Sequence, residues 1–196
     1  MEFAEVLRKR RMVRHFKTDP IDPAAVDRIL DLARRAPSGG FTQGQSFVVV
    51  TDPDLRRAVA RICEEEEYLS LLQHRWISEA PVQIIVCVSE ADYHARYRET
   101  DKVQPDGTEI PWPIPYWFVD AGCSMMLVLL AAVDEGLAAG FAGPVDLPAL
   151  RALLGIPVEV IPIGVIPLGY PDRDVRSPSL ERGRKPFDAV IHRDRW

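Results

Sequence analysis

The sequence predicts an α+β or α/β layered domain, in which helices flank a sheet of two or three buried strands. Two β-branched runs carry this prediction, SFVVVTD (46–52) and APVQIIVCVSE (80–90), and the second is apolar enough to be buried on both faces. Amphipathic stretches with helix-start signals surround them. The 196 residues, 47% hydrophobic and 27% charged, have the length and composition of one globular domain, residues 1–196.

The first half of the chain alternates predicted helices with a strand. Residues 2–11 have the pattern of an amphipathic helix. The next helix begins at Asp22, a good N-cap, and Pro23, which suits the first helical position. It stops before the glycine-bearing loop 37–45, which leads to the first strand. An Asp-Pro pair then repeats the helix-start signal for a helix over 52–69.

Residues 91–116 interrupt this alternation with four prolines and a predicted turn at Asp106-Gly107. An unstructured stretch of this length inside a compact domain is usually functional, so we expect an ordered loop or a short helix over a surface. The run 118–137 is apolar all round. It predicts a helix buried in the middle of the domain and closed by Gly136.

The last third of the chain predicts a short helix and a third strand. PVDLPALRALLGIP (144–157) reads as a capped helix that ends at Gly155. The run 160–171 is strand-like, but Pro162 and Pro167 favour an edge strand or an interrupted one. The tail is polar, and its final apolar stretch is a candidate to add to the sheet.

Composition argues against several classes of protein. The longest apolar run, 121–133, is too short to span a bilayer, and the N-terminus lacks the apolar region of a signal peptide, so we expect a cytoplasmic protein without a membrane partner. Three cysteines without a CxxC pair indicate buried free thiols. The four histidines have no ligand-like spacing, so no metal is expected. The acidic balance and the lack of an aromatic-basic stripe argue against nucleic acid.

Basic side chains gather at the two ends of a chain whose formal net charge is −5. Residues 1–17 contain six Lys or Arg and residues 173–195 contain seven, which is 13 of the 24 in the protein. Two basic ends that meet in space would bind one anion. The alternative is two solvated termini.

No local catalytic signature accompanies these cations. The sequence has no GxGxxG after either strand, no GxxxxGK[ST], no GxSxG and no HExxH. This argues against a dinucleotide-binding Rossmann site, a P-loop, a serine hydrolase elbow and a zinc protease. A protein with anion-binding arginines and no catalytic side-chain motif often takes its reactive group from a cofactor.

Five stretches, in order, carry a resemblance that runs essentially from end to end. They are RRMVRHF (10–16), APSGGFTQGQSFVVV (36–50), MLVLLAAVDEGLAAGFAG (126–143), GIPVEVIPIGVIPLGYP (155–171) and LERGRKPFDAVIH (180–192). Together they resemble the nitroreductase family of FMN-dependent enzymes. The resemblance implies an α+β fold with a central mixed or antiparallel sheet flanked by helices. It also implies a domain-swapped homodimer whose flavin site is shared between subunits, with the helix 119–133 at or near the interface.

The resemblance assigns the basic ends to FMN. Arg10 and Arg11 would lie near the phosphate and ribityl chain, and Arg14 near flavin N1 and O2. Arg182 and Arg184 would approach the phosphate from the other end of the chain. Guanidinium groups suit a phosphate dianion because they donate parallel, charge-assisted hydrogen bonds. For each arginine the alternative is a solvated surface charge.

The resemblance also implies flavin contacts outside the arginines. The small residues of the loop 37–39 would pack on the ring, and a backbone N–H in 140–142 would point at N5; the alternatives are a helix stop and a post-helix turn. The implied cofactor-binding set is Arg10, Arg11, Met12, Arg14, Pro37, Ser38, Gly39, Phe41, Gln73, Gly140, Phe141, Ala142, Gly143, Arg182 and Arg184. Gln73 would contact the pyrimidine ring, although a surface amide looks identical.

The sequence departs from the family pattern at two of these positions. Met12 stands where the family usually has Ser, which removes one hydroxyl from the phosphate site. Phe41 stands where it usually has Asn, and Gly44-Gln45 replace Pro-Trp. Phe41 is a candidate to stack against or shield the ring instead of hydrogen bonding to it. These changes bear on the substrate and the nicotinamide more than on the flavin.

The implied activity is an NAD(P)H-dependent FMN oxidoreductase that reduces nitroaromatic, quinone or related small acceptors by a ping-pong hydride transfer. No catalytic side chain is expected, because the chemistry takes place at flavin N5. Phe41, Trp112, Tyr116 and Trp117 are candidates to contact a flat substrate. The alternative for the aromatic residues of the proline-rich stretch is packing on their own domain.

Two alternatives stay open within the same fold. One is a specialised flavin enzyme, such as a flavin-consuming synthase, a dehydrogenase of modified peptides or a dehalogenase. The other is a flavin-binding protein without turnover. The region 91–117 has no family pattern, so the sequence does not separate these alternatives.

Overall fold

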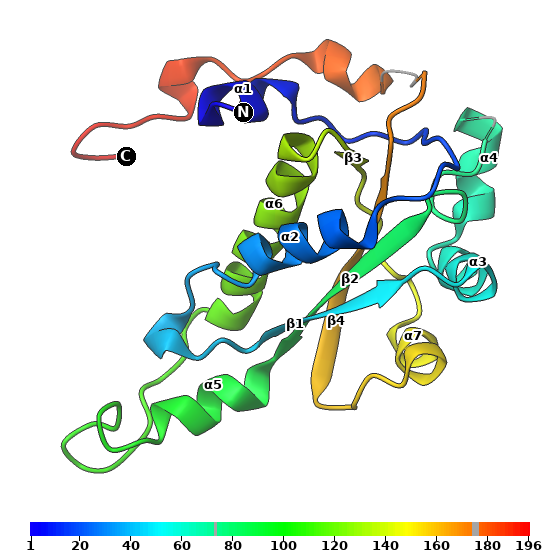
Figure 1. The fold of residues 1–196 in the computed structure, drawn as a ribbon. Helices are drawn as coiled ribbons and strands as arrows, with labels where there is room; N and C mark the ends of the chain where they lie inside the picture. Colours follow the sequence, from blue (N-terminus) through cyan, green and yellow to red (C-terminus); the bar gives the residue numbers. More distant parts are fainter. Residues whose placement is uncertain (73, 174–176) are drawn as a thin grey trace.

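The computed structural model describes residues 1–72, 74–173 and 177–196, and a four-stranded sheet forms its centre (Figure 1). The strand order is β1-β2-β4-β3, with bounds Gln45–Val50 (β1), Val82–Ser89 (β2), Val160–Gly169 (β4) and Ala138–Ala139 (β3). Each neighbouring pair is antiparallel. The predicted α+β class, with a central antiparallel sheet flanked by helices, is confirmed.

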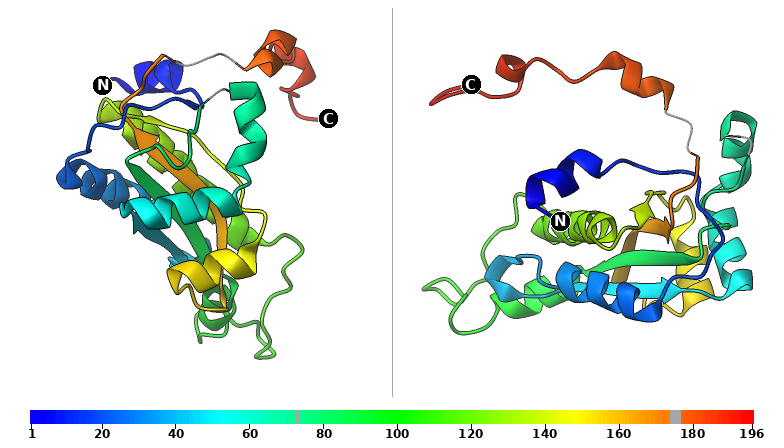
Figure 2. Two further views of the ribbon diagram at one scale, coloured as in Figure 1. Left: turned by 90° about the vertical axis from the view of Figure 1, so that its right-hand side faces the viewer. Right: turned by 45° about the horizontal axis from the view of Figure 1, so that its top comes forward.

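Two helical layers cover the two faces of the sheet (Figures 1 and 2). One layer contains α2 (Pro23–Ala33) and α6 (Tyr116–Asp134), and the other contains α3 (Pro53–Ile62) and α7 (Leu147–Leu154). Each layer closes its own apolar core against the sheet, which is how layered folds bury the faces of their elements.

The strand β2 connects both cores. All eight of its residues are buried, as its β-branched sequence predicts. Successive side chains point to opposite faces, so Ile84 and Val86 pack with α2 and α6 while Ile85 and Cys87 pack with α3 and α7. The register of β2 therefore determines which side chains fill each core.

The strand β4 lies between β2 and β3, so the prediction of an edge strand from its prolines was wrong. The predicted interruption is confirmed, because the register of β2 and β4 shifts between Val86 and Cys87. The partner strand β3 pairs with β4 at Leu168 and Gly169 only. Such a short partner demands few ladder hydrogen bonds from β4, which makes its prolines tolerable inside the sheet.

The helix predicted over 52–69 is two helices, α3 and α4 (Glu65–Leu72). The break falls at Glu64, whose φ is +54°. The buried carboxylate of Glu65 accounts for it, because Oε1 accepts hydrogen bonds from the N–H groups of Ile77 (2.5 Å) and Ser78 (2.9 Å). This contact with the chain that leads into β2 redirects the backbone after α3. The helical spacing of apolar residues in the sequence does not predict it.

Local start and stop signals are confirmed. Asp22 accepts a hydrogen bond from the N–H of Ala24, and Asp52 caps α3 in the same way. Gly155 ends α7 in the left-handed conformation, with φ at +65°. Gly107 forms the predicted turn with φ at +79°. These features depend on two or three neighbouring residues, so sequence alone identifies them.

The helix α6 buries one face only, so the prediction of a helix buried all round in the middle of the domain was wrong. Phe118, Val119 and Met126 are 41%, 49% and 40% exposed. By length and composition α6 is also apolar enough to cross a membrane, although its longest uninterrupted apolar run looked too short for this in the sequence. Its other face packs into the core with α2 and β2, so it is a core helix with one bare apolar face.

The two ends of the chain lie at the same end of the molecule, where α6 finishes, and Figure 2 shows the two termini apart from each other there. The N-terminal helix α1 covers Phe3–Lys9, and the ammonium group of Met1, two residues before it, pairs with Asp134 at the end of α6. The C-terminal arm (residues 177–196) contains two short 3₁₀ helices, Pro178–Arg182 and Phe187–Ala189, and no strand, so the predicted addition to the sheet was wrong. The arm is exposed throughout 179–196.

The cap segment (residues 90–115) is ordered, as predicted, and begins with α5 (Glu90–Tyr97). Its loop is organised by Glu109, whose carboxylate accepts hydrogen bonds from Trp112 Nε1 (2.6 Å) and Arg98 Nε (3.0 Å) and contacts His94 Nδ1 (2.5 Å). This bond to Glu109 raises the pKa of His94, against the effect of burial. Burial also opposes ionisation of Glu109, but the hydrogen bonds from His94 and Trp112 leave its pKa lowered.

We expect the cap segment to lose protection above neutral pH. The pKa of His94 is higher in the folded protein than its ordinary value of 6.5, so protonated His94 stabilises the folded cap segment fully below pH 6.5. This stabilisation is lost as the pH rises through the raised pKa. The lowered pKa makes Glu109 stabilising above its ordinary 4.5, so the pair stabilises most between these two values. Amide exchange of residues 98–112, corrected for intrinsic rates, should be faster at about pH 8.5 than at about pH 6. Equal protection at both pH values in the parent, or an unchanged pH dependence in His94→Gln, would contradict this.

Gly140 lies where three segments meet, directly after β3. Its N–H donates to Pro167 O (3.0 Å) in β4. A Cβ added to it would lie 2.6 Å from the carbonyl oxygen of Val13 and 2.7 Å from the ring of Trp76. The backbone at Val13 has little room to move, because its own N–H is bound to Ala139 O (3.1 Å).

The variant Gly140→Ala should therefore lower the free energy of unfolding by about 2 kcal/mol, as overpacking of a core does. For a chain of this size each kcal/mol lowers Tm by roughly 2–4 °C. The matched control is Gly143→Ala, where a Cβ meets nothing within 4 Å, and it should change stability by less than about 0.5 kcal/mol. Thermal unfolding followed by circular dichroism measures both, and equal Tm values for the two variants would refute the argument.

Candidate functional site

The two basic ends of the sequence meet around one cavity of about 740 Å³, which we call the basic cavity. It is lined by Arg8, Lys9, Arg10, Arg11, Met12, Arg14, Ser177, Ser179, Leu180 and Arg184. Six of these side chains are cationic and none is acidic. Of the predicted phosphate ligands, Arg10, Arg11 and Arg184 are brought together here, whereas Arg182 is exposed and is not among the lining residues described.

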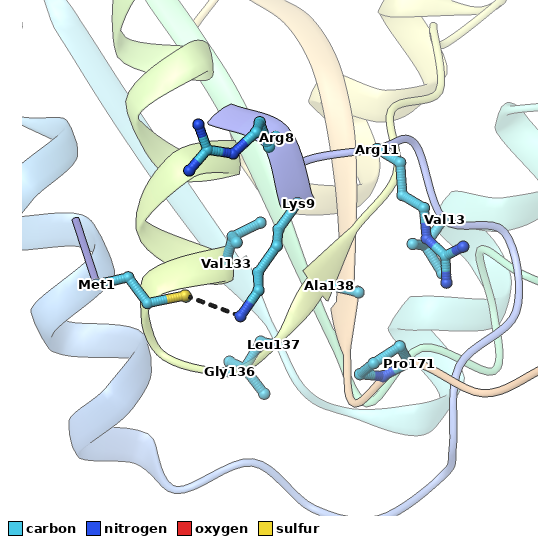
Figure 3. A pocket seen from close by; sticks show the side chains of 10 residues that line it. All are labelled: Met1, Arg8, Lys9, Arg11, Val13, Val133, Gly136, Leu137, Ala138 and Pro171. Carbon is cyan, nitrogen blue, oxygen red and sulfur yellow. Dashed lines mark hydrogen bonds between the residues drawn. The ribbon is translucent and has the colours of Figure 1, made fainter. Parts of the chain in front are cut away.

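A second cavity of about 530 Å³ adjoins the basic cavity and shares Arg8, Lys9 and Arg11 with it. Figure 3 shows Lys9 reaching from α1 toward Met1, and Arg11 pointing toward Val13. Its other walls are mostly apolar and come from the end of α6, from β3 and from the chain after β4. Arg11 therefore stands between the two cavities.

The connector that follows α1 (residues 10–17) holds its arginines by pairing with the sheet. Met12 forms a parallel bridge with Ala139, and Val13 N–H donates to Ala139 O (3.1 Å). The guanidinium carbon of Arg14 lies 5.5 Å from the centre of the Trp76 ring, a cation–π contact that orients the side chain. Extended pairing of the connector thus displays Met12 and Arg14 at the cavity.

A pair of histidines joins this connector to the start of the arm. His15 and His74 stack with ring centroids 4.0 Å apart. The Nδ1–H of His15 donates to Arg173 O (2.6 Å), and the Nε2–H of His74 donates to Arg14 O. The stack therefore positions the backbone of Arg14 and the chain that leads to Arg184.

The segment Gly140 to Gly143 adjoins the connector, as the prediction of a common site requires. The N–H of Gly140 donates to Pro167 O and that of Ala142 donates to Val165 O (2.9 Å). Phe141 N–H makes no hydrogen bond within the part of the chain that the structure describes. Of the three predicted backbone donors, Phe141 is thus the one that remains available to a ligand.

The glycine loop (residues 37–44) lies at the opposite end of α6 from α1 (Figure 1), whose Arg8 and Lys9 line the basic cavity. Gly39 N–H donates to Asp120 Oδ2 (2.8 Å), five residues into α6, whereas the ammonium group of Met1, at the start of the basic end, pairs with Asp134. At a rise of about 1.5 Å per residue, the two helical positions are roughly 21 Å apart. One chain therefore does not bring Pro37, Ser38, Gly39 and Phe41 to the basic cavity.

The predicted aromatic contacts divide into packed and exposed side chains. Trp117 is 7% exposed and packs with Tyr93, and Trp112 is half-buried in the same cluster. Trp112 and Trp117 therefore pack on their own domain, which was the alternative to contact with a substrate. Tyr116 and Phe41 are 43% and 76% exposed and remain available to a ligand. Gln73 lies outside the described residues.

Reactive side chains are scarce in the described ranges. No group of three or more His, Cys, Asp or Glu comes together there as a metal site. The three cysteines are free, and burial raises the pKa of Cys63 to about 12 and that of Cys87 to about 11. Both thiols therefore stay protonated and are poor nucleophiles.

Sequence reasoning missed several residues of these sites. Arg8 and Lys9 line the basic cavity, although the predicted set began at Arg10. Asp120 holds the glycine loop, and its signal was present in the sequence as one acid within the apolar run FVDAGCSMMLVLL. Tyr93, which donates to the same carboxylate oxygen (2.8 Å), had no signal at all.

Comparison with known proteins finds relatives of this chain in sequence and in fold. Human iodotyrosine deiodinase 1 is 29% identical over 209 residues, covering 97% of this chain and 68% of that protein. A solved structure of oxidised iodotyrosine deiodinase bound to FMN and 3-iodo-L-tyrosine shares the fold, with a TM-score of 0.71 and 23% identity over 99% of each chain. The NADPH:FMN oxidoreductase from Vibrio harveyi complexed with NAD⁺ does so with a TM-score of 0.72 and 24% identity, covering 99% of this chain and 77% of that one. The model of the Nitroreductase family matches residues 7–170, and the chain belongs to this family.

Proposed function

We propose that the protein binds FMN with its phosphate in the basic cavity. The observation that carries this proposal is the cavity itself, where six cationic side chains and no carboxylate gather in a chain of net charge −5. A phosphate dianion offsets the mutual repulsion of these cations and accepts their charge-assisted hydrogen bonds. The two serines from the arm add hydroxyl donors to the lining. The residues present thus fit the phosphate end of FMN, even without the family's hydroxyl at Met12.

The flavin ring would then lie between two subunits of a homodimer. The glycine loop and the basic cavity are at opposite ends of α6, so a second chain supplies the loop for each cavity. The exposed Phe118, Val119 and Met126 on α6 give an apolar face of the kind that homodimers bury. The arm leaves its own chain exposed, and its apolar side chains Phe187 and Ile191 suit docking on the partner.

The reaction we propose is the two-electron reduction of a small organic acceptor, with NADH or NADPH as the reductant. When bound, FMN accepts a hydride at N5 and passes reducing equivalents to the acceptor. The residues of this chain would hold and orient the flavin. Arg14 would supply positive charge at the pyrimidine edge, and Phe141 N–H is available at the N5 side. The exposed Phe41 and Tyr116 line the side on which a flat acceptor would stack. The buried free thiols fit a reducing compartment such as the cytoplasm.

Reductive dehalogenation is the second candidate, and a specific observation favours it. Human iodotyrosine deiodinase 1 is similar to this chain over 97% of its length, so the likeness includes the cap segment as well as the FMN-binding stretches. The proposed acceptor is in that case a halogenated phenol or aryl amino acid. The cap segment, whose aromatic cluster borders the glycine loop, would be the part that selects it.

The first test is the visible absorbance spectrum of the purified protein. We expect a flavin band and about one FMN per chain, released on denaturation. Anaerobic NADH or NADPH should bleach the band, and reoxidation by a nitroaromatic, a quinone or 3-iodotyrosine, the last with iodide release, then assigns the acceptor class. A stable band with every reductant points to a flavin-binding protein without turnover. Absence of flavin, together with no uptake of added FMN, rules the proposal out.

The phosphate role predicts how single arginines affect FMN affinity. Arg184→Ala removes one charge-assisted contact from the basic cavity, so the Kd for FMN should rise about tenfold to a hundredfold. Riboflavin, which lacks the phosphate, should bind parent and variant equally. Arg193→Ala, in the same exposed arm but away from the basic cavity, is the control and should leave the Kd unchanged. An Arg184→Ala protein that retains parental affinity would exclude this arginine from the phosphate site.

A further inference from the structure

The glycine loop has an unusually strained backbone. Gly40, Phe41 and Gln43 have φ values of +60°, +58° and +55°, and two of the three carry a side chain. The left-handed conformation costs a non-glycine residue roughly 1–2 kcal/mol, so such a loop persists only where neighbouring groups hold it. The result of the strain is that Phe41 points outward, with 76% of its surface exposed.

Two helices hold this loop from opposite sides. Asp120 of α6 accepts a hydrogen bond from Gly39 N–H at Oδ2 (2.8 Å). Arg96 of α5 donates from Nε to Gly40 O (2.9 Å). The two bonds act on adjacent residues, one at Gly39 N–H and one at Gly40 C=O, so together they orient the peptide groups on either side of the one that joins Gly39 to Gly40.

The same carboxylate oxygen of Asp120 also accepts the hydroxyl hydrogen of Tyr93 (2.8 Å). Tyr93 is fully buried, and burial raises the pKa of its hydroxyl well above the ordinary value, so it stays a donor at any physiological pH. Asp120 is thus the point at which the glycine loop, α6 and the cap segment are joined.

The cap segment secures the second bond in turn. Arg96 forms a bidentate pair with Asp101, with both N–O distances at 2.7 Å. A Cβ on Gly40 would lie 2.9 Å from the ring of Tyr97, so this ring closes over the loop. Movement of the cap segment therefore displaces Arg96 and Tyr97, the two residues of this segment that contact the strained backbone.

We propose that Asp120 is a positioning residue, which keeps the glycine loop in the strained conformation that presents Phe41 to the flavin ring bound by the partner subunit. Through Tyr93 it also transmits the position of the cap segment to the loop. Occupancy of the cap segment by a substrate thereby adjusts the contact on the flavin. The contact of Phe41 with the flavin rests on the proposed function. The hydrogen bond from Gly39 to Asp120, in contrast, lies within this one chain.

The test compares Asp120→Asn with the parent, with Asp92→Asn as a matched control. Asp92 is an exposed acid on α5, so its variant makes the same chemical change on the helix that carries Tyr93. Both donors bond to Oδ2, so an amide at position 120 keeps an acceptor oxygen but loses its negative charge, which weakens both bonds. Amide exchange of residues 38–44, measured without flavin, should be about tenfold faster in Asp120→Asn, as expected for the loss of charge assistance from two hydrogen bonds, and unchanged in the control.

The flavin readouts separate positioning from general stability. We expect Asp120→Asn to bind FMN within about threefold of the parent, because the phosphate contacts are elsewhere, and to change the visible circular dichroism of the flavin. It should also lower kcat about tenfold or more, as misplacement of a group near the reacting atoms does. Parental dichroism and kcat in a fully loaded variant would overturn the proposal, as would unchanged amide exchange in the loop.

Tyr93→Phe keeps the test decisive where Asp120→Asn does not fold. It removes one donor and leaves the bond to Gly39, so exchange of the loop should rise by a smaller factor, and the flavin dichroism should shift in the same direction. No change in either readout would overturn the link to the cap segment. A parent that binds no FMN refutes the proposed function, whereas loop exchange in the same protein still reports on Asp120.

Discussion

The burial of β2 on both faces is the constraint on which the rest of the structure depends. A strand with no solvent face needs two helical layers, and its alternating side chains determine what each layer contacts. The antiparallel neighbour β4 then carries β3, and β3 carries the connector that holds Met12 and Arg14. The basic end of the chain is thereby attached to the sheet by backbone hydrogen bonds, which are insensitive to the charge they display.

The charges of this basic end suit the anion-binding role that we propose for it. Six cations around one cavity repel one another, and no acidic residue is among the described lining residues, although Glu5 pairs with Lys9 (2.7 Å). An anion that binds only the folded chain both relieves this repulsion and adds stability, by an amount that grows with the logarithm of its concentration once this exceeds Kd. With FMN bound as we propose, the site would link ligand binding to folding through residues from both ends of the sequence.

Prediction from sequence succeeded where a few neighbouring residues decide the outcome and failed where distant residues decide it. The caps at Asp22 and Asp52 and the stop at Gly155 are local, and all three form as predicted. The break before α4 depends on Glu65 reaching residues 77 and 78, and the interior place of β4 depends on strand order. The burial of Trp117 and the hold of Asp120 on the glycine loop likewise arise between elements far apart in the sequence.

By itself the sequence determined the layered α+β class, the strand buried on both faces, and the two groups of cations that suit an anion. These properties follow from composition and from short-range sequence patterns. They can therefore be predicted without knowing how the chain folds in space. Only the tertiary structure decided that Arg10 and Arg184 share a cavity while the glycine loop lies at the far end of α6. The reason is that a site formed from separate segments depends on how a long, rigid helix spaces them, and no local pattern encodes that distance.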